Sequence, residues 1–64
     1  MKEKYIKLRD ARGMTDAQVA RETGIPVTTL YSFVKSDRKD VKLSVDNAKR
    51  IAKLFNVTLD FLAE

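Results

Sequence analysis

Three polar residues in the stretch VTTLYSFVK, residues 27–35, have the spacing of one face of a helix. Thr28, Ser32 and Lys35 fall opposite the apolar Leu30 and Phe33 when successive residues turn by about 100°. Hydroxyl groups can donate or accept hydrogen bonds at the edges of DNA bases, and an ammonium group can bind guanine or phosphate. This face is therefore a candidate nucleic-acid contact, and the alternative is the ordinary solvated face of a surface helix.

A second amphipathic helix comes immediately before this segment. The residues TDAQ form a capping box, in which the Thr15 hydroxyl accepts from the Gln18 backbone and the Gln18 side chain accepts from the Thr15 backbone. Gly24 permits the positive φ of a helix end, and Pro26 has the fixed φ that suits the first turn of a following helix. The sequence thus predicts two short helices joined by a tight turn within residues 16–35.

Similar start and stop signals divide the rest of the chain into helices. Residues 2–12 have helical spacing and are followed by Gly13, a typical C-terminal stop. A serine cap begins a helix over 44–55, and Asn56 suits the left-handed position after it. A last short helix is predicted over 58–63. With five helical segments and no strand pattern, we expect one all-α domain over residues 1–64.

The composition excludes several classes of function. The 64 residues contain no histidine and no cysteine, which removes the usual zinc ligands, thiol nucleophiles and general bases. There is no phosphate-binding glycine loop either. We therefore expect no enzyme, no cofactor, no metal and no small-molecule substrate.

Charge and hydropathy give weaker limits on partners and location. The formal net charge of +4 fits either a polyanionic partner or simply a soluble surface. Apolar runs are too short to span a membrane, and the charged first residues do not resemble a signal peptide. We expect a cytoplasmic protein with no membrane partner. Cations of the first and fourth helices are expected only to solubilise the domain: Lys2, Lys4, Lys7, Lys49, Arg50 and Lys53.

The helix pair carries the most specific pattern. Small residues stand at Ala20 and Gly24, where two helices cross closely, and apolar residues stand at Val19, Ile25 and Leu30. With the flanking segments LRDARGMT and KRIAKLFNVTLDFL, the chain from about residue 5 to residue 62 resembles the Cro/CI-type, or XRE, helix-turn-helix family of phage and bacterial repressors. The resemblance implies a compact five-helix bundle of the lambda-repressor-like type, with its helix-turn-helix at about residues 16–35.

That resemblance also implies a function. The expected activity is sequence-specific binding of double-stranded DNA by a transcriptional repressor, with the helix at about 27–35 in the major groove. The base contacts carried over are Val27, Thr28, Ser32 and Lys35. The phosphate contacts carried over are Arg38, Lys39 and Lys42, for which the alternative is a hydrated loop. The role of Tyr31 is left open, between the DNA face and the edge of the core.

Three features depart from the family pattern. Asp16 stands where relatives commonly carry a phosphate-binding Gln. Its carboxylate would repel DNA, although a negative charge at this position stabilises the N-terminus of the helix. Arg9 would face Val34 rather than the glutamate that relatives often place there, so its partner must be another group or water. The loop after the recognition helix lacks the usual glycine, which leaves the placing of its basic residues open.

Apolar residues divide into a core and a remainder. The expected core residues are Tyr5, Leu8, Val19, Leu30, Phe33, Ile51, Phe55, Val57 and Leu62. The remainder comprises Ile6 with a candidate dimer surface formed by Leu54, Leu59 and Phe61. Repressors of the family commonly bind as homodimers with recognition helices about 34 Å apart. The alternative is a scatter of ordinary surface residues.

A protein-interaction module is the alternative function. Such a module would keep the helix-turn-helix core but bind another protein, as an antirepressor or antitoxin-like partner does, with weak or no DNA binding. Asp16 is the main sequence feature that favours it. A steep salt dependence of binding to generic duplex DNA would distinguish the two functions.

Overall fold

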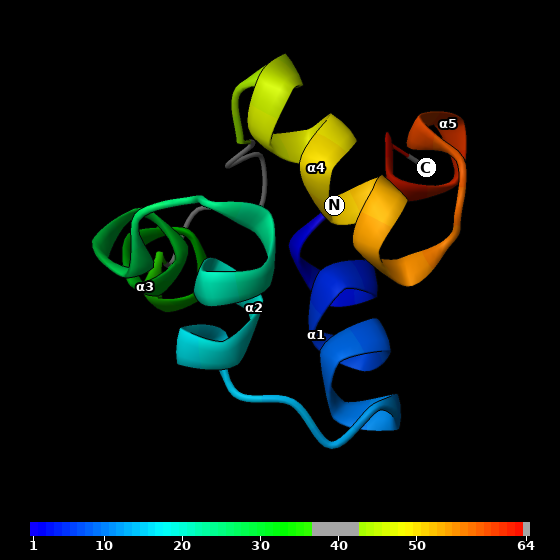
Figure 1. The fold of residues 1–64 in the computed structure, drawn as a ribbon. Helices are drawn as coiled ribbons and strands as arrows, with labels where there is room; N and C mark the ends of the chain where they lie inside the picture. The colour runs from blue at the N-terminus through cyan, green and yellow to red at the C-terminus, as the bar shows by residue number, and fades with distance from the viewer. Residues whose placement is uncertain (37–42, 64) are drawn as a thin grey trace.

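Five α-helices run through the residues that the structure, a computed structural model, describes, namely 1–36 and 43–63. They are α1 (Lys2–Ala11), α2 (Asp16–Thr23), α3 (Val27–Lys35), α4 (Val45–Phe55) and α5 (Leu59–Ala63). No strand occurs in these two ranges, and the predicted all-α class is confirmed. Helix α2 contacts both α3 and α4, while α1 packs on α3 and α5 packs on α4. Figure 1 shows α2 beside α3, and α5 beside α4.

Local capping explains where α2 begins and ends. The Gln18 backbone N–H donates to the Thr15 hydroxyl over 3.1 Å, and the Thr15 N–H donates to the Gln18 side-chain oxygen over 2.8 Å. The predicted capping box is therefore confirmed. At the other end Gly24 has a φ of 79°, and its N–H donates to the carbonyl of Ala20. Pro26 directly precedes α3 rather than forming its first residue.

The same logic holds at the ends of α4 and α5. The Asn47 N–H donates to the Ser44 hydroxyl over 3.2 Å, so Ser44 is the predicted N-cap. Asn56 has a φ of 57° and ends α4 in the left-handed conformation, as expected. The Phe61 N–H donates to the Thr58 hydroxyl at the start of α5. These short-range bonds fix helix boundaries that are visible in the sequence.

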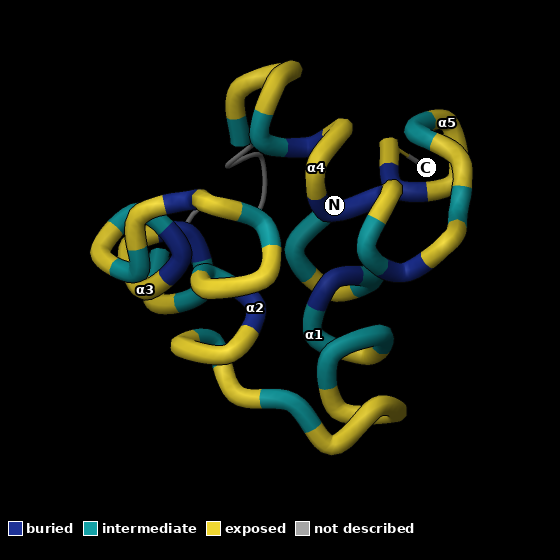
Figure 2. The backbone as a smooth tube through the Cα atoms, viewed as in Figure 1, coloured by how far each residue is buried: buried dark blue, intermediate teal, exposed yellow. Residues whose placement is uncertain are grey.

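Tyr5 lies at the centre of a core to which all five helices contribute. Its ring centroid is 5.9 Å from that of Phe33 and 6.3 Å from that of Phe55. The buried positions are dark blue in Figure 2; they are Tyr5, Val19, Ile25, Leu30, Phe33, Ala48, Ile51, Ala52, Phe55 and Leu62. Leu8 and Val57, which were expected in the core, are half-buried and pack against its edge.

Cationic side chains from other helices close the ends of α2 and α3. The Arg50 guanidinium donates to the carbonyl of Thr23, the last residue of α2, over 3.0 Å. The Lys2 ammonium donates to the carbonyl of Ser36, which directly follows α3. Helix C-termini carry unpaired carbonyls and a partial negative charge, and a cation satisfies both.

The ends of α4 and α5 are closed in the same way. Arg12 donates to the carbonyl of Leu54 over 3.1 Å, and the Lys4 ammonium donates to the carbonyl of Phe61 over 2.8 Å. The expectation that Lys2, Lys4 and Arg50 merely solubilise the domain is therefore wrong. Each of them joins its own helix to the end of another.

The turn between α2 and α3 should not tolerate a branched side chain at Gly24. A Cβ atom there would lie 3.0 Å from the Arg50 guanidinium, and the φ of 79° is itself unfavourable for valine. We expect Gly24→Val to lower the free energy of unfolding by about 1–3 kcal/mol. Chemical denaturation measures this change.

Gly13→Val is the matched control for the Gly24 substitution. Gly13 also has a positive φ, of 64°, but a Cβ atom there would meet nothing within 4 Å. We expect a smaller loss of stability at Gly13, because only backbone strain is introduced. Equal losses at the two positions would show that the close approach of the new side chain at position 24 to Arg50 does not affect stability.

Candidate nucleic-acid interface

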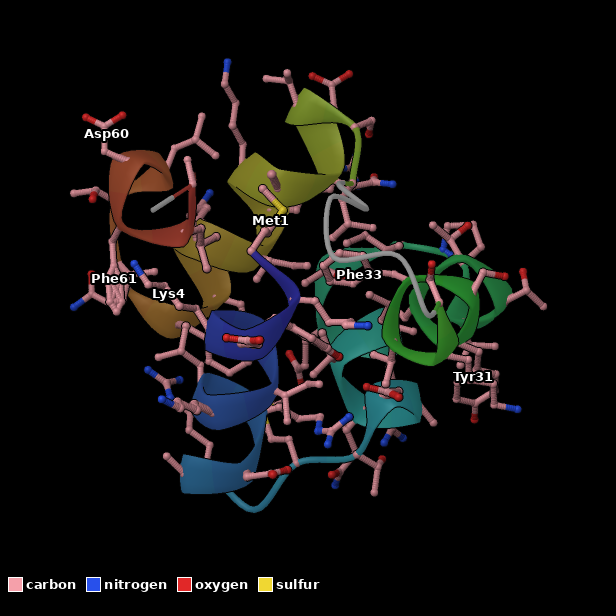
Figure 3. All side chains as sticks on the ribbon, turned by 180° about the vertical axis from the view of Figure 1, so that it is seen from behind. Met1, Lys4, Tyr31, Phe33, Asp60 and Phe61 are labelled. Atoms are coloured by element: carbon pink, nitrogen blue, oxygen red, sulfur yellow. The ribbon has the colours of Figure 1, made fainter. Side chains whose placement is uncertain are left out.

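The outer face of α3 is formed by four exposed side chains one helical turn or two apart. They are Thr28, Tyr31, Ser32 and Lys35. On the opposite side of the helix, Leu30 is 0% and Phe33 is 3% exposed. In Figure 3, Phe33 lies toward the middle of the molecule, whereas Tyr31 lies at its outer edge. The helix therefore has one face fixed in the core and one free of it.

Val27 and Tyr31 define the limits of this outer face. Val27, a predicted base contact, is half-buried at the start of α3. Tyr31, whose role the sequence left open, is 42% exposed, and the Lys35 ammonium lies 5.8 Å from its ring centroid. Tyr31 is three residues from Thr28 and four from Lys35, a spacing that is compatible with this face but did not settle its role from the sequence.

Asp16, the acidic residue at the start of α2, is held by two side chains of α1. Its Oδ1 accepts from the Tyr5 hydroxyl over 2.6 Å and from the Arg9 guanidinium over 2.9 Å. Arg9 also binds the carboxylate of Asp10, with a shortest distance of 3.0 Å. The sequence offered no partner for Arg9 at Val34. The structure shows that Arg9 binds two carboxylates, those of Asp10 and Asp16.

Tyr5 and Arg9 each keep one protonation state near neutral pH. Removal of the Tyr5 side chain from water, with its hydrogen bond to Asp16, raises the pKa of the Tyr5 hydroxyl above its ordinary value. The hydrogen bond to Asp16 likewise raises the pKa of Arg9. Tyr5 therefore remains a neutral donor and Arg9 remains a cation.

The predicted phosphate contacts Arg38, Lys39 and Lys42 lie outside the described residues. Those residues follow α3 and precede α4 in the chain, and their contacts stay a prediction.

The candidate dimer surface lies elsewhere, around α5. Leu54 and Leu59 are half-buried, and so is the neighbouring Ile6. Phe61 is 37% exposed, with the Lys4 ammonium 4.6 Å from its ring centroid. Figure 3 places Phe61 and Tyr31 at opposite edges of the molecule.

Comparison with protein families decides the assignment of the α2–turn–α3 unit. A family model described as helix-turn-helix matches residues 6–62, almost the whole chain. The chain belongs to this Cro/CI-type helix-turn-helix family. Comparison with curated proteins and with solved structures gives no match. As a helix-turn-helix protein, the chain is placed among DNA-binding transcription regulators, a family that is typically not enzymatic.

Within residues 1–36 and 43–63, no group of acidic side chains is arranged to hold a metal ion. Among the helices described, none combines the length and apolar character needed to cross a membrane.

Proposed function

We propose that this helix-turn-helix protein is a sequence-specific transcriptional repressor of phage or bacterial type, which inserts α3 into the major groove of double-stranded DNA. The exposed row of Thr28, Tyr31, Ser32 and Lys35 is the observation that supports this most. An α-helix fits the major groove, and helix-turn-helix proteins present the second helix of the pair to the bases. The core anchors the other face of α3, which keeps this row fixed in orientation.

Each side chain of the row has a distinct chemical capacity. The Thr28 and Ser32 hydroxyls donate to or accept from base edges, and Val27 offers methyl groups to a thymine methyl. Lys35 reaches guanine or phosphate. Tyr31 adds an apolar ring and a hydroxyl to the same face, so we include it among the residues proposed to face DNA.

Homodimer formation is part of the same proposal. Two copies joined through Leu54, Leu59 and Phe61 would place two α3 helices on one side of a duplex, in successive major grooves about 34 Å apart. The partly exposed Phe61 ring supports this choice of surface. A dimer would double the number of phosphate contacts and so strengthen binding.

The pairing of Asp16 with Arg9 weakens the main argument for a protein-interaction module. Asp16 favoured it, because an unpaired carboxylate would repel DNA. In the structure that carboxylate is paired with Arg9 and is only 12% exposed. Fluorescence anisotropy of a generic labelled duplex between about 50 and 200 mM salt separates the two functions, since a DNA-binding protein loses affinity steeply over this range. Weak binding that hardly changes with salt would favour the module.

We expect Arg38 and Lys39 to contribute phosphate contacts. Replacing both by glutamine should weaken binding to every duplex about equally. It should also reduce the slope of log K against log salt by roughly 1.8, because two fewer phosphates are neutralised and fewer counterions are released. Salt titrations of the parent and the double variant measure this slope.

Lys7 and Lys53, both exposed on other helices, provide the control pair. Their replacement by glutamine changes the net charge by the same amount as the Arg38 and Lys39 substitutions. If both double variants reduce the slope equally, the effect is one of net charge and the loop makes no special contact.

A further inference from the structure

We propose that Arg9 neutralises the charge of Asp16, with Tyr5 as a positioning residue that holds the carboxylate in place, and that this allows the first helix of the pair to approach the DNA backbone. This inference rests on the proposed function. It concerns α1, which the recognition of bases does not otherwise involve. It also accounts for an acidic residue at the start of α2, where a free carboxylate would oppose binding.

The geometry shows that Asp16 is enclosed rather than merely adjacent to a cation. Two donors converge on the same oxygen, Oδ1, from Tyr5 at 2.6 Å and from Arg9 at 2.9 Å. The Asp16 side chain is 12% exposed and that of Arg9 is 18% exposed. Tyr5 is 0% exposed in the core, so its hydroxyl is fixed in space. A partly buried pair of this kind is screened less by salt than a surface pair.

Asp10 provides an internal comparison. It shares the same guanidinium at 3.0 Å, but its side chain is 63% exposed. It stands in α1, outside the helix-turn-helix pair, and an exposed pair contributes little because water already solvates both charges. Arg9 therefore holds one carboxylate that water can solvate and one, Asp16, that water largely cannot.

The placing of Asp16 makes its charge important for DNA. It is the first residue of α2, and in helix-turn-helix proteins this first helix crosses the phosphate backbone. A carboxylate left without Arg9 at that end would repel the phosphates and offset part of the attraction that counterion release supplies. With Arg9 in place, the charge of the Asp16 carboxylate is compensated by the guanidinium that it binds.

The test compares Arg9→Gln alone with two double variants, Arg9→Gln/Asp16→Asn and Arg9→Gln/Asp10→Asn. We expect Arg9→Gln to weaken binding to a generic duplex and to lower the slope of log K against log salt by roughly 0.9, the equivalent of one phosphate contact. Adding Asp16→Asn should restore both affinity and slope to near the parent values. Adding Asp10→Asn should restore much less, although the two double variants have the same net charge.

Three outcomes would overturn the inference. Equal restoration by Asp10→Asn would show that only net charge matters, and an unchanged affinity in Arg9→Gln would show that Asp16 lies away from the phosphates. In both cases the parent chain still binds DNA, and the proposed function survives. Absence of salt-dependent binding by the parent chain would instead overturn the proposed function and this inference with it. Denaturation curves for each variant establish that the compared proteins are folded.

Discussion

Replacing Phe33 by alanine is expected to lower the free energy of unfolding by about 3–5 kcal/mol, enough to unfold much of so small a domain at room temperature. The Phe33 side chain is 3% exposed and its ring packs on Tyr5 at the centre of the core. Its removal would leave a cavity where α1 and α3 meet. Chemical denaturation followed by circular dichroism measures the change.

Tyr31→Ala is the matched control, since it removes an aromatic ring from the same helix two positions away. Tyr31 is 42% exposed, and surface substitutions usually alter stability by no more than about 0.5 kcal/mol. A loss at Tyr31 as large as that at Phe33 would contradict the division of α3 into a core face and an outer face.

The double substitution Thr28→Ala with Ser32→Ala is expected to abolish most discrimination between a preferred duplex and random DNA. Both hydroxyls are on the exposed side of α3, and each lost base contact costs about 1–3 kcal/mol of discrimination. Nonspecific affinity should change little, because phosphate contacts supply it. Competition titrations on a duplex selected from a random pool measure the ratio of the two affinities.

The stability of this double variant should match that of the parent, because neither hydroxyl side chain is in the core. If the affinity ratio stays unchanged in a folded double variant, Thr28 and Ser32 do not contact bases. Recognition would then have to come from Val27, Tyr31, Lys35 or the deformability of the duplex.

Helix positions were predictable because local interactions set them. The capping box at Thr15, the left-handed Gly24 and Asn56, and the Ser44 cap each involve residues within four positions of one another. Apolar spacing of three and four likewise identified Leu30 and Phe33 as core residues. These features can be predicted from the sequence because each depends only on residues that are close together in the chain.

Contacts between distant cations and carbonyls were not predictable. Arg50 and Thr23 are 27 residues apart, and Lys4 and Phe61 are 57 apart. A lysine on a polar helical face looks the same whether it ends in water or at the carbonyl of another helix. Only the packing of the helices decides between the two.

The candidate site was predictable in part. Spacing placed Thr28, Ser32 and Lys35 on one face, and all three are exposed in the structure. The exposure of Tyr31 depends on how the apolar face of α3 packs against the core. The pairing of Arg9 with Asp16 depends on how α1 packs beside the start of α2. Both are properties of tertiary packing rather than of local sequence.

NMR spectroscopy of the isotope-labelled chain, titrated with a selected duplex, tests most directly whether α3 enters the DNA. The proposed function predicts that the largest changes in backbone amide shifts fall on Thr28, Tyr31, Ser32 and Lys35, with smaller changes at the start of α2. The α5 amides do not contact DNA in this account, so changes in their shifts would report the proposed dimer contact instead. Shifts confined to α4 and α5, or no shifts at low salt, would contradict the account.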